Sequence, residues 1–125
     1  MFDRKKMQEY LPREAYKAVT DAIEKGVKSI SVFDGNTGES FDFSDTDEIR
    51  YVVENIQSTK MKKDTLSIGY SGYSFRISFF DENGKEIENF MINSSNTIRK
   101  DPFFYRCDGN LCFDYLKELE EKYSS

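Results

Sequence analysis

The sequence predicts an α+β domain, an antiparallel sheet of about five to seven strands with two or three helices packed on one face. The first observation is that short stretches alternate β-branched or aromatic residues with polar ones, as half-buried strands do. The second is that turn residues separate consecutive stretches, which indicates hairpins and hence an antiparallel sheet. The third is that other segments carry apolar residues at helical spacing, and such helices cover the apolar face of a sheet.

Composition indicates one domain over residues 1–125. Charged residues make up 33% of the chain, and no linker-like or repetitive segment divides it. A chain of this length buries roughly two-thirds of its unfolded surface, so it needs no disulfide or metal to fold. No apolar run approaches the ~20 residues of a membrane helix, so we expect no membrane span.

The first half of the chain predicts two helices and a hairpin. Residues 12–25 are expected to form an amphipathic helix that begins at Pro12. Strands over 27–33 and 40–44 are joined by the turn-forming sequence DGNTGE. A helix follows over 45–58, with a capping box of Asp45 and Glu48 at its start. Its apolar stripe is Ile49, Val52, Val53 and Ile56.

The second half predicts the rest of the sheet and a terminal helix. We expect strands around 61–70 and 73–80, followed by a tight turn at 81–84. Three further strands follow in the sequences KEIENFMIN, NTIRK and FFYRC, with Pro102 between the last two. The last helix spans 114–123 and is expected to turn Leu116, Leu119 and Tyr123 inward.

Histidine is absent, and this excludes several kinds of chemistry. A Ser-His-Asp or Cys-His catalytic arrangement is impossible, as is a histidine-ligated metal. Two cysteines do not complete a four-sulfur site. We therefore expect no catalytic residue, no metal and no cofactor, and we expect that the protein is not an enzyme. The alternative enzyme is a carboxylate-based hydrolase, which requires two converging Asp or Glu side chains with perturbed pKa values.

Negative charge is concentrated in residues 34–48, which contain no basic side chain. Calcium is one interpretation, but the EF-hand pattern fails because Glu39 stands where that loop requires glycine. Acidic residues at the start of a helix are also favoured by the helix dipole. The third interpretation is an acidic docking patch for a basic partner, made of Asp34, Glu39, Asp42, Asp45, Asp47 and Glu48.

Cys107 and Cys112 flank a four-residue stretch with turn character. If this stretch is a hairpin loop, the two Cα atoms fall within the ~4.4–6.8 Å that a disulfide requires. Cys112 also shares a helical stripe with Leu116 and Leu119, so it is alternatively a buried thiol at the start of the last helix. The sequence leaves a Cys107–Cys112 disulfide and two unlinked thiols open.

The aromatic pairs Phe79-Phe80 and Phe103-Phe104 bear on binding. Neighbours on a strand point to opposite faces, so one member of each pair is covered by another element or faces solvent. Most aromatic residues are expected in the core. Solvent-side phenylalanines would indicate a partner-binding surface.

The sequences YSFRISFFDENGKEIENFMIN, FFYRCDGNL and DYLKELEEKY together resemble the C-terminal half of small uncharacterised α+β domains of Gram-positive bacteria. Some of those domains are carried on lipoproteins. The resemblance covers about residues 73–123 and implies an α+β domain that is often extracytoplasmic. It assigns no role to any residue.

We therefore expect a small acidic, non-enzymatic binding domain that acts through a protein surface. The net charge of −5 disfavours direct binding to nucleic acid, so we expect another protein as the partner. The alternative is an acidic inhibitor or immunity-type protein that occupies a basic groove of a nucleic-acid-binding target. The protein is cytoplasmic if Met1 is the native start, and extracytoplasmic if a signal or lipoprotein segment has been removed. The sequence does not decide the oligomeric state.

Overall fold

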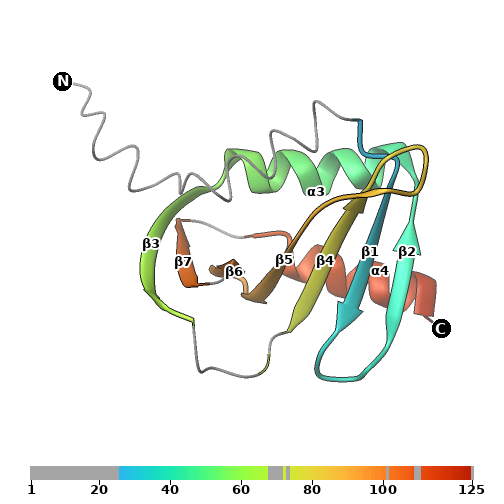
Figure 1. Ribbon diagram of the computed structural model, residues 1–125. Helices are drawn as coiled ribbons and strands as arrows, with labels where there is room; N and C mark the ends of the chain where they lie inside the picture. The colour runs from blue at the N-terminus through green and yellow to red at the C-terminus, as the bar shows by residue number, and fades with distance from the viewer. Residues whose placement is uncertain (1–25, 68–71, 73, 101, 109–110, 125) are drawn as a thin grey trace.

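The computed structural model describes residues 26–67, 72, 74–100, 102–108 and 111–124. The predicted helix over 12–25 lies outside these residues. Within them, the chain forms a sheet and two helices, and Figure 1 shows that the sheet is curled. The strands are β1 Ser29–Asp34, β2 Ser40–Phe43, β3 Lys60–Leu66, β4 Phe75–Phe80, β5 Glu86–Ser94, β6 Thr97–Lys100 and β7 Phe103–Asp108. The helices are α3 Thr46–Ser58 and α4 Phe113–Ser124.

All seven strands belong to one antiparallel sheet, in the order β2-β1-β4-β5-β6-β7-β3. Strands β4 to β7 follow one another as neighbours, as consecutive hairpins predict. Strand β3 instead pairs with β7 at the far edge, and α3 carries the chain there from β2. The α+β class and the antiparallel sheet are thus confirmed, whereas the order of the edge strands was not predicted.

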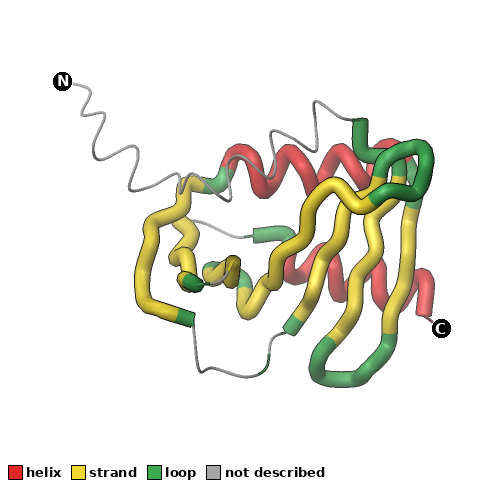
Figure 2. Tube along the Cα trace, in the orientation of Figure 1, coloured by secondary structure: helices red, strands yellow, loops and turns green. Residues whose placement is uncertain are grey.

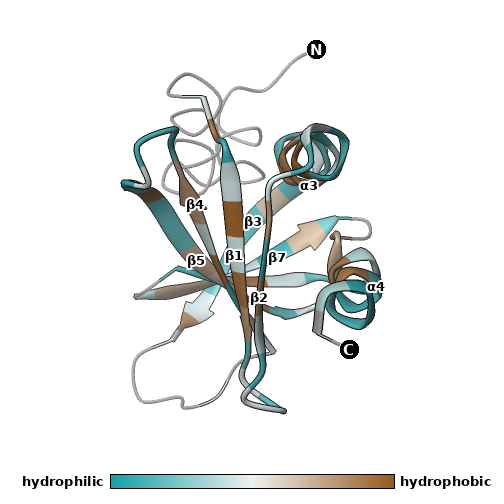
Figure 3. Ribbon diagram, turned by 90° about the vertical axis from the view of Figure 1, so that its right-hand side faces the viewer, coloured by the Kyte–Doolittle hydropathy of each residue, from teal (hydrophilic) through white to brown (hydrophobic). Residues whose placement is uncertain are grey.

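The two described helices lie on the same side of the sheet and run across its strands. Figure 3 views both helices nearly along their axes, and Figure 2 shows them in red beside the yellow strands. The face of the sheet that these helices approach is called the inner face below, and the opposite one the outer face. This division matters because successive side chains of each strand go to the two faces in turn.

Helix α3 begins where its sequence predicts. The side chain of Asp45 accepts a hydrogen bond of 3.0 Å from the backbone N–H of Glu48, which satisfies one of the free donors at the helix start. The capping box is only half formed, because the Glu48 side chain binds Lys122 and Tyr123 instead. The predicted stripe of Ile49, Val52, Val53 and Ile56 is buried.

The core is built from the inner face of the sheet and the apolar sides of the helices. Alternate residues of β1 and β4 are almost fully buried, which confirms the period of two in those strands. Fully buried large side chains include Tyr105, Phe75, Phe79, Ile30, Ile77, Ile92, Ile98 and Leu116.

Helix α4 buries Leu116 and Leu119 as predicted, but Tyr123 is 39% exposed. Its ring stacks against Phe41 and Phe43 of β2, with both centroid distances 6.3 Å. Its hydroxyl donates a hydrogen bond to Glu48. Tyr123 therefore lies at the edge of the core, because the helix ends there and its polar tip finds a partner.

Candidate functional site

A row of five side chains crosses the outer face of the sheet. Phe33 of β1 is directly opposite Arg76 of β4, and Arg76 is opposite Met91 of β5. Met91 is in turn opposite Arg99 of β6, and Arg99 is opposite Phe104 of β7. Residues directly opposite on neighbouring strands point to the same face. These five residues are called the outer row.

The outer row is accessible from outside the molecule. Phe33 is 38% exposed, Arg76 is exposed, and Met91, Arg99 and Phe104 are half-buried. Among the described elements, no helix lies over this face (Figure 3). The guanidinium of Arg99 lies over the ring of Phe104, 5.9 Å from its centroid, which helps to fix both side chains.

Each of the two aromatic pairs places one phenylalanine on the inner face and one on the outer face, as alternation along a strand requires. Phe79 is buried in the core, and its neighbour Phe80 is half-buried on the outer face. Phe103 packs against the core, and Phe104 belongs to the outer row. The pairs thus place two phenylalanines on the outer face, which is the feature that the sequence suggested as a sign of partner binding.

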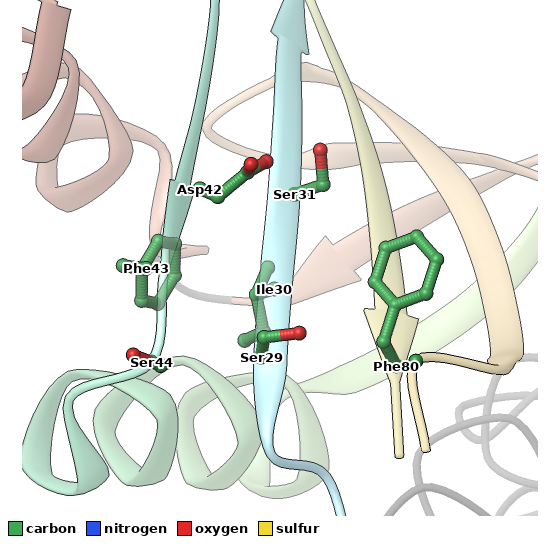
Figure 4. Close-up of a pocket in the computed structure, with 8 residues that line it drawn as sticks. Ser29, Ile30, Ser31, Asp42, Phe43, Ser44 and Phe80 are labelled. Atoms are coloured by element: carbon green, nitrogen blue, oxygen red, sulfur yellow. The ribbon is translucent and has the colours of Figure 1, made fainter. Parts of the chain in front are cut away.

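Next to the outer row, the outer face has a hollow of about 440 Å³. Ser29 and Ser31 of β1 line it together with Asp42 of β2 and Phe80 of β4. Figure 4 shows Asp42 reaching from β2 toward β1, with the Phe80 ring on the other side of β1. The hollow exists because serines alternate with the core residues of β1, and their small side chains leave the space beside Phe80 open.

A smaller hollow of about 230 Å³ adjoins the middle of the outer row. It is lined by Asn89, Phe90, Met91, Arg99 and Lys100. Lys100 is held by an ion pair with Glu88 and donates a hydrogen bond of 2.8 Å to the backbone oxygen of Asn89. The charge of Lys100 is therefore balanced locally, and Arg99 is the second cationic side chain that lines this hollow.

The predicted acidic patch is divided between different parts of the fold. Asp34 is buried, and its Oδ1 accepts hydrogen bonds from the backbone N–H groups of Asn36 and Thr37, at 2.7 and 3.3 Å. It stabilises the turn between β1 and β2. Glu48 is also buried, with its carboxylate 2.7 Å from the ammonium of Lys122.

The other four acidic residues are exposed but do not share one face. Asp45 caps α3, and Asp47 pairs at 3.7 Å with Arg50 of the next turn. Asp42 lies on the outer face, opposite Ser31. Glu39 precedes β2, near α4. Alternation in β2 and the helical turn of α3 send these side chains in different directions.

One pair of carboxyl groups does converge, and the acidic stretch supplies only one member of it. Glu120 of α4 faces Asp34, and its pKa is raised from 4.5 to about 7. Burial is the largest cause, followed by a hydrogen bond to Asp34 and repulsion from Asp34 and Glu39, while Lys117 opposes the shift. Protonation of Glu120 relieves its repulsion with Asp34, whose Oδ1 already accepts two backbone donors.

This pair predicts a pH dependence of stability. Because the folded pKa of Glu120 lies above its unfolded value, the native state binds the extra proton between pH 4.5 and about 7. The free energy of unfolding therefore falls as pH rises through that window. Glu120→Gln should remove this loss and stabilise the protein above pH 7 by up to about 1 kcal/mol, a modest value because solvent screens a partly exposed group.

Urea unfolding of both proteins across the same window measures this difference. Near pH 4.5 the two stabilities should converge. Glu118→Gln is the matched control, since Glu118 is exposed on the same helix and should leave the pH dependence unchanged. Equal stability of the Glu120→Gln variant and the unaltered protein above pH 7 would contradict the prediction.

The two cysteines are free thiols in the structure, and both are buried. Cys107 is on β7 beside Met61 of β3, and the carbonyl of Cys112 accepts the first α4 hydrogen bond from Leu116, at 2.9 Å. Cys112 thus lies at the start of the last helix, where the sequence analysis placed it in the alternative of two unlinked thiols. Burial raises the pKa of both thiols to about 12, so they are poor nucleophiles at neutral pH.

We therefore expect two free thiols that do not react with iodoacetamide in the folded protein. Unfolding in guanidinium should expose both, and intact mass should then show two carbamidomethyl groups without any reductant. A mass that gains these groups only after reduction would establish a Cys107–Cys112 disulfide instead. Glu118→Cys, at an exposed position of α4, provides the positive control for labelling of the folded chain.

Two features of the site were missed from the sequence. The outer row requires strand register, which joins residues between 33 and 104 that no sequence spacing relates. The Asp34–Glu120 pair joins a hairpin to the last helix. The signal available in the sequence was the two pairs of adjacent phenylalanines. Each pair indicated that one ring lies on the outer face, but it did not show which residues of other strands lie beside that ring.

The fold places this protein among small α+β domains in which an antiparallel sheet has helices packed on one side. Two such helices are described here. Neither described helix has the length and apolar character needed to cross a membrane. Within the described residues, no group of three or more His, Cys, Asp or Glu side chains is arranged to hold a metal ion.

Comparison with known proteins adds no assignment to this class. No family model matches the chain, and no solved structure matches it. A stretch of 26 residues is 85% identical to a glutamine synthetase of Bacteroides fragilis (strain YCH46). The match covers 21% of this chain and spans only 4% of that protein, so it shows neither a family nor a function for the chain.

Proposed function

We propose that this protein is a small non-enzymatic binding domain and that another protein binds the outer face of its sheet. The observation that carries the proposal is the outer row, in which two arginines, a methionine and two phenylalanines stand in register on neighbouring strands. Arginine, methionine and aromatic residues are the types enriched in protein interfaces.

The position of the outer row supports this use. Strands fix the backbone at these five positions, so a partner that binds there orders side chains but no backbone. The hollow beside Phe80 adds a recess that an apolar side chain can enter. The edge strand β3 is less suitable, because it presents Lys60, Lys62, Lys63 and Asp64, and charged residues discourage strand addition.

Site-specific photocrosslinking in the native host tests the binding face. A benzophenone amino acid at Ser78, in the middle of the outer face, should form an adduct with a partner protein. The same amino acid at Glu118, exposed on α4, should not. Adducts of equal yield at both positions, or at Glu118 alone, would overturn the proposed face. Thermal unfolding of both variants checks that the fold is kept.

A second proposal, also for a non-enzymatic binding protein, is an acidic inhibitor or immunity-type protein. The placement of the acidic residues supports it less well. Its target would contact the exposed Glu39, Asp42, Asp45 and Asp47, which the fold divides between faces. Such a complex should weaken steeply as salt is added. A salt-insensitive complex would rule it out.

A carboxylate-based hydrolase is the competing function, and the Asp34–Glu120 pair is the observation that favours it. Two facing carboxyl groups with a raised pKa are a known arrangement for general acid–base catalysis. The hollows on the outer face are lined by other residues, however, and Asp34 is engaged in its turn. Hydrolysis of ester, phosphodiester or glycoside substrates that Glu120→Gln abolishes would establish this function in place of the binding domain.

A further inference from the structure

We propose that the hollow beside Phe80 binds an arginine of the partner protein. The guanidinium of that arginine meets the carboxylate of Asp42, and an apolar residue two positions away in the same extended segment packs on the Phe80 ring. This inference rests on the proposed function and names the chemistry of the partner at one place on the outer face. It is argued from the charge and the spacing of the residues that line the hollow.

The carboxylate of Asp42 is open to a ligand. Asp42 is exposed on β2, and within the described part of the chain its carboxylate has no hydrogen bond and no ion pair. It is the one charged residue among the eight described residues that line the hollow, and the arginines of the outer row do not line it. A recess whose only lining charge is a carboxylate favours a cation over an anion or a neutral group.

Serine hydroxyls extend the set of acceptors around this carboxylate. Ser31 is directly opposite Asp42 in the pairing of β1 with β2, and Ser29 lies two residues before it on the same strand. Figure 4 shows the Asp42 side chain directed toward Ser31. A guanidinium carries five N–H donors in one plane, so it can bind both carboxylate oxygens and a hydroxyl together. An ammonium carries its three donors on one nitrogen, and arginine therefore fits this set better than lysine.

The ring of Phe80 fixes the position of the second contact. Phe80 of β4 is directly opposite Ser29, so it lies two residues along the sheet from the pair of Ser31 and Asp42. Residues two apart in an extended segment face the same side and are separated by about 7 Å. A segment that lies above β1 therefore presents an arginine to Asp42 and an apolar residue to Phe80 when one residue separates the two.

The net charge of the chain favours a different protein as the source of this arginine. At −5, the chain attracts a basic segment at long range. A second copy of the chain carries the same net charge and is repelled. A segment with the pattern arginine, any residue, apolar residue is therefore complementary to the hollow in charge, polarity and spacing.

NMR titration of the ¹⁵N-labelled full chain tests the inference. The probe is a short peptide in which one alanine separates an arginine from a leucine. Its match carries citrulline, a neutral side chain of nearly the same shape, in place of arginine. We expect the arginine peptide to bind about tenfold more tightly and to shift the backbone amide signals of Ser31 and Asp42. A peptide with lysine in place of arginine should bind with intermediate affinity.

Two variants locate the site. Asp42→Asn removes the charge but keeps the shape, so it should abolish the preference for arginine over citrulline, and its fold should be kept because the carboxylate is exposed. Ser31→Val narrows the hollow with a residue type that strands favour, so it should weaken both peptides several-fold. Glu118→Gln is the matched control, since it removes one negative charge from an exposed position of α4 and should leave both affinities unchanged.

Several results would overturn the inference. These are equal binding of the arginine and citrulline peptides, no binding by the arginine peptide, tighter binding of the lysine peptide, or an unchanged preference in Asp42→Asn. Unchanged affinities in Ser31→Val would also exclude the hollow. The triple variant Arg4→Gln, Lys5→Gln, Lys6→Gln should leave the affinity for the arginine peptide unchanged. A rise in that variant would assign the hollow to the first residues of this chain and exclude the partner's arginine.

The test is separable from that of the proposed function. Asp42→Asn in the chain that carries the benzophenone amino acid at Ser78 should lower the yield of the partner adduct, and Glu118→Gln should not. An unchanged yield with Asp42→Asn would overturn the arginine site and leave the outer face as the binding face. Absence of any adduct at Ser78 would overturn the proposed face, while the peptide titration would still decide whether the hollow binds arginine.

Discussion

Phe79→Ala is expected to lower the free energy of unfolding by about 3–5 kcal/mol. Phe79 is 1% exposed, and its ring packs 5.6 Å from that of Phe90 on the neighbouring strand. Truncation leaves a cavity between the sheet and the helices. Strands cannot close such a cavity without breaking their ladder of hydrogen bonds. Urea unfolding monitored by circular dichroism measures the loss.

Phe80→Ala is the matched control for this prediction. Phe80 is the next residue on the same strand, but it is half-buried on the outer face and lines the open hollow. Its truncation leaves no enclosed cavity and should cost only about 1 kcal/mol. Similar losses for the two variants would contradict the assignment of inner and outer faces. The same pair bears on binding, since only Phe80→Ala alters the partner surface.

Glu48→Ala is expected to cost about 2 kcal/mol, because it removes a partly buried connection between the two described helices. Glu48 of α3 accepts hydrogen bonds from the Lys122 ammonium, at 2.7 Å, and from the Tyr123 hydroxyl of α4. The charge of the carboxylate also stabilises the start of α3. The hydrogen bonds to Glu48 are the largest cause of the raised pKa of both Lys122 and Tyr123.

Asp47→Ala separates the connection from the effect of helix charge. Asp47 is the preceding residue in the same first turn, and its side chain is 90% exposed. Asp47→Ala should lower the free energy of unfolding by only a few tenths of a kcal/mol, as the loss of an exposed charge usually does. In a double-mutant cycle of Glu48→Ala with Tyr123→Phe, the losses of unfolding free energy should be non-additive, because each change removes the same hydrogen bond. Equal effects of Glu48→Ala and Asp47→Ala would exclude the inter-helix connection.

The local elements of this fold were predictable because their signals lie within a few residues. The hairpin of β1 and β2 follows from alternation around a turn, and α3 follows from its stripe and from Asp45 at its start. The strand predicted around 61–70 corresponds to β3, Lys60–Leu66, and residues 68–70 of that prediction lie outside the described residues. Tyr123 was expected inside the core and is partly exposed, because it lies in the last turn of α4.

The candidate site shows the limit of the same reasoning. The six acidic residues are close in sequence, and the sequence therefore suggested one patch. The fold instead buries Asp34 and Glu48 and gives each a partner. The outer row was not predicted, because β1 pairs with β4 although β2, α3 and β3 lie between them in the chain, and because the register of each strand pair cannot be derived from sequence spacing.

The sequence by itself determined the class of this protein, the existence of most of its described strands and helices, and the chemistry that the absence of histidine excludes. Only the tertiary structure decided that β3 joins the far edge of the sheet, that Glu120 meets Asp34, and that Phe33 and Phe104 end one row with two arginines between them. The physical reason is that periodicity and turn signals act over a few residues. The pairing of distant strands and the burial of charge depend on how all segments pack together.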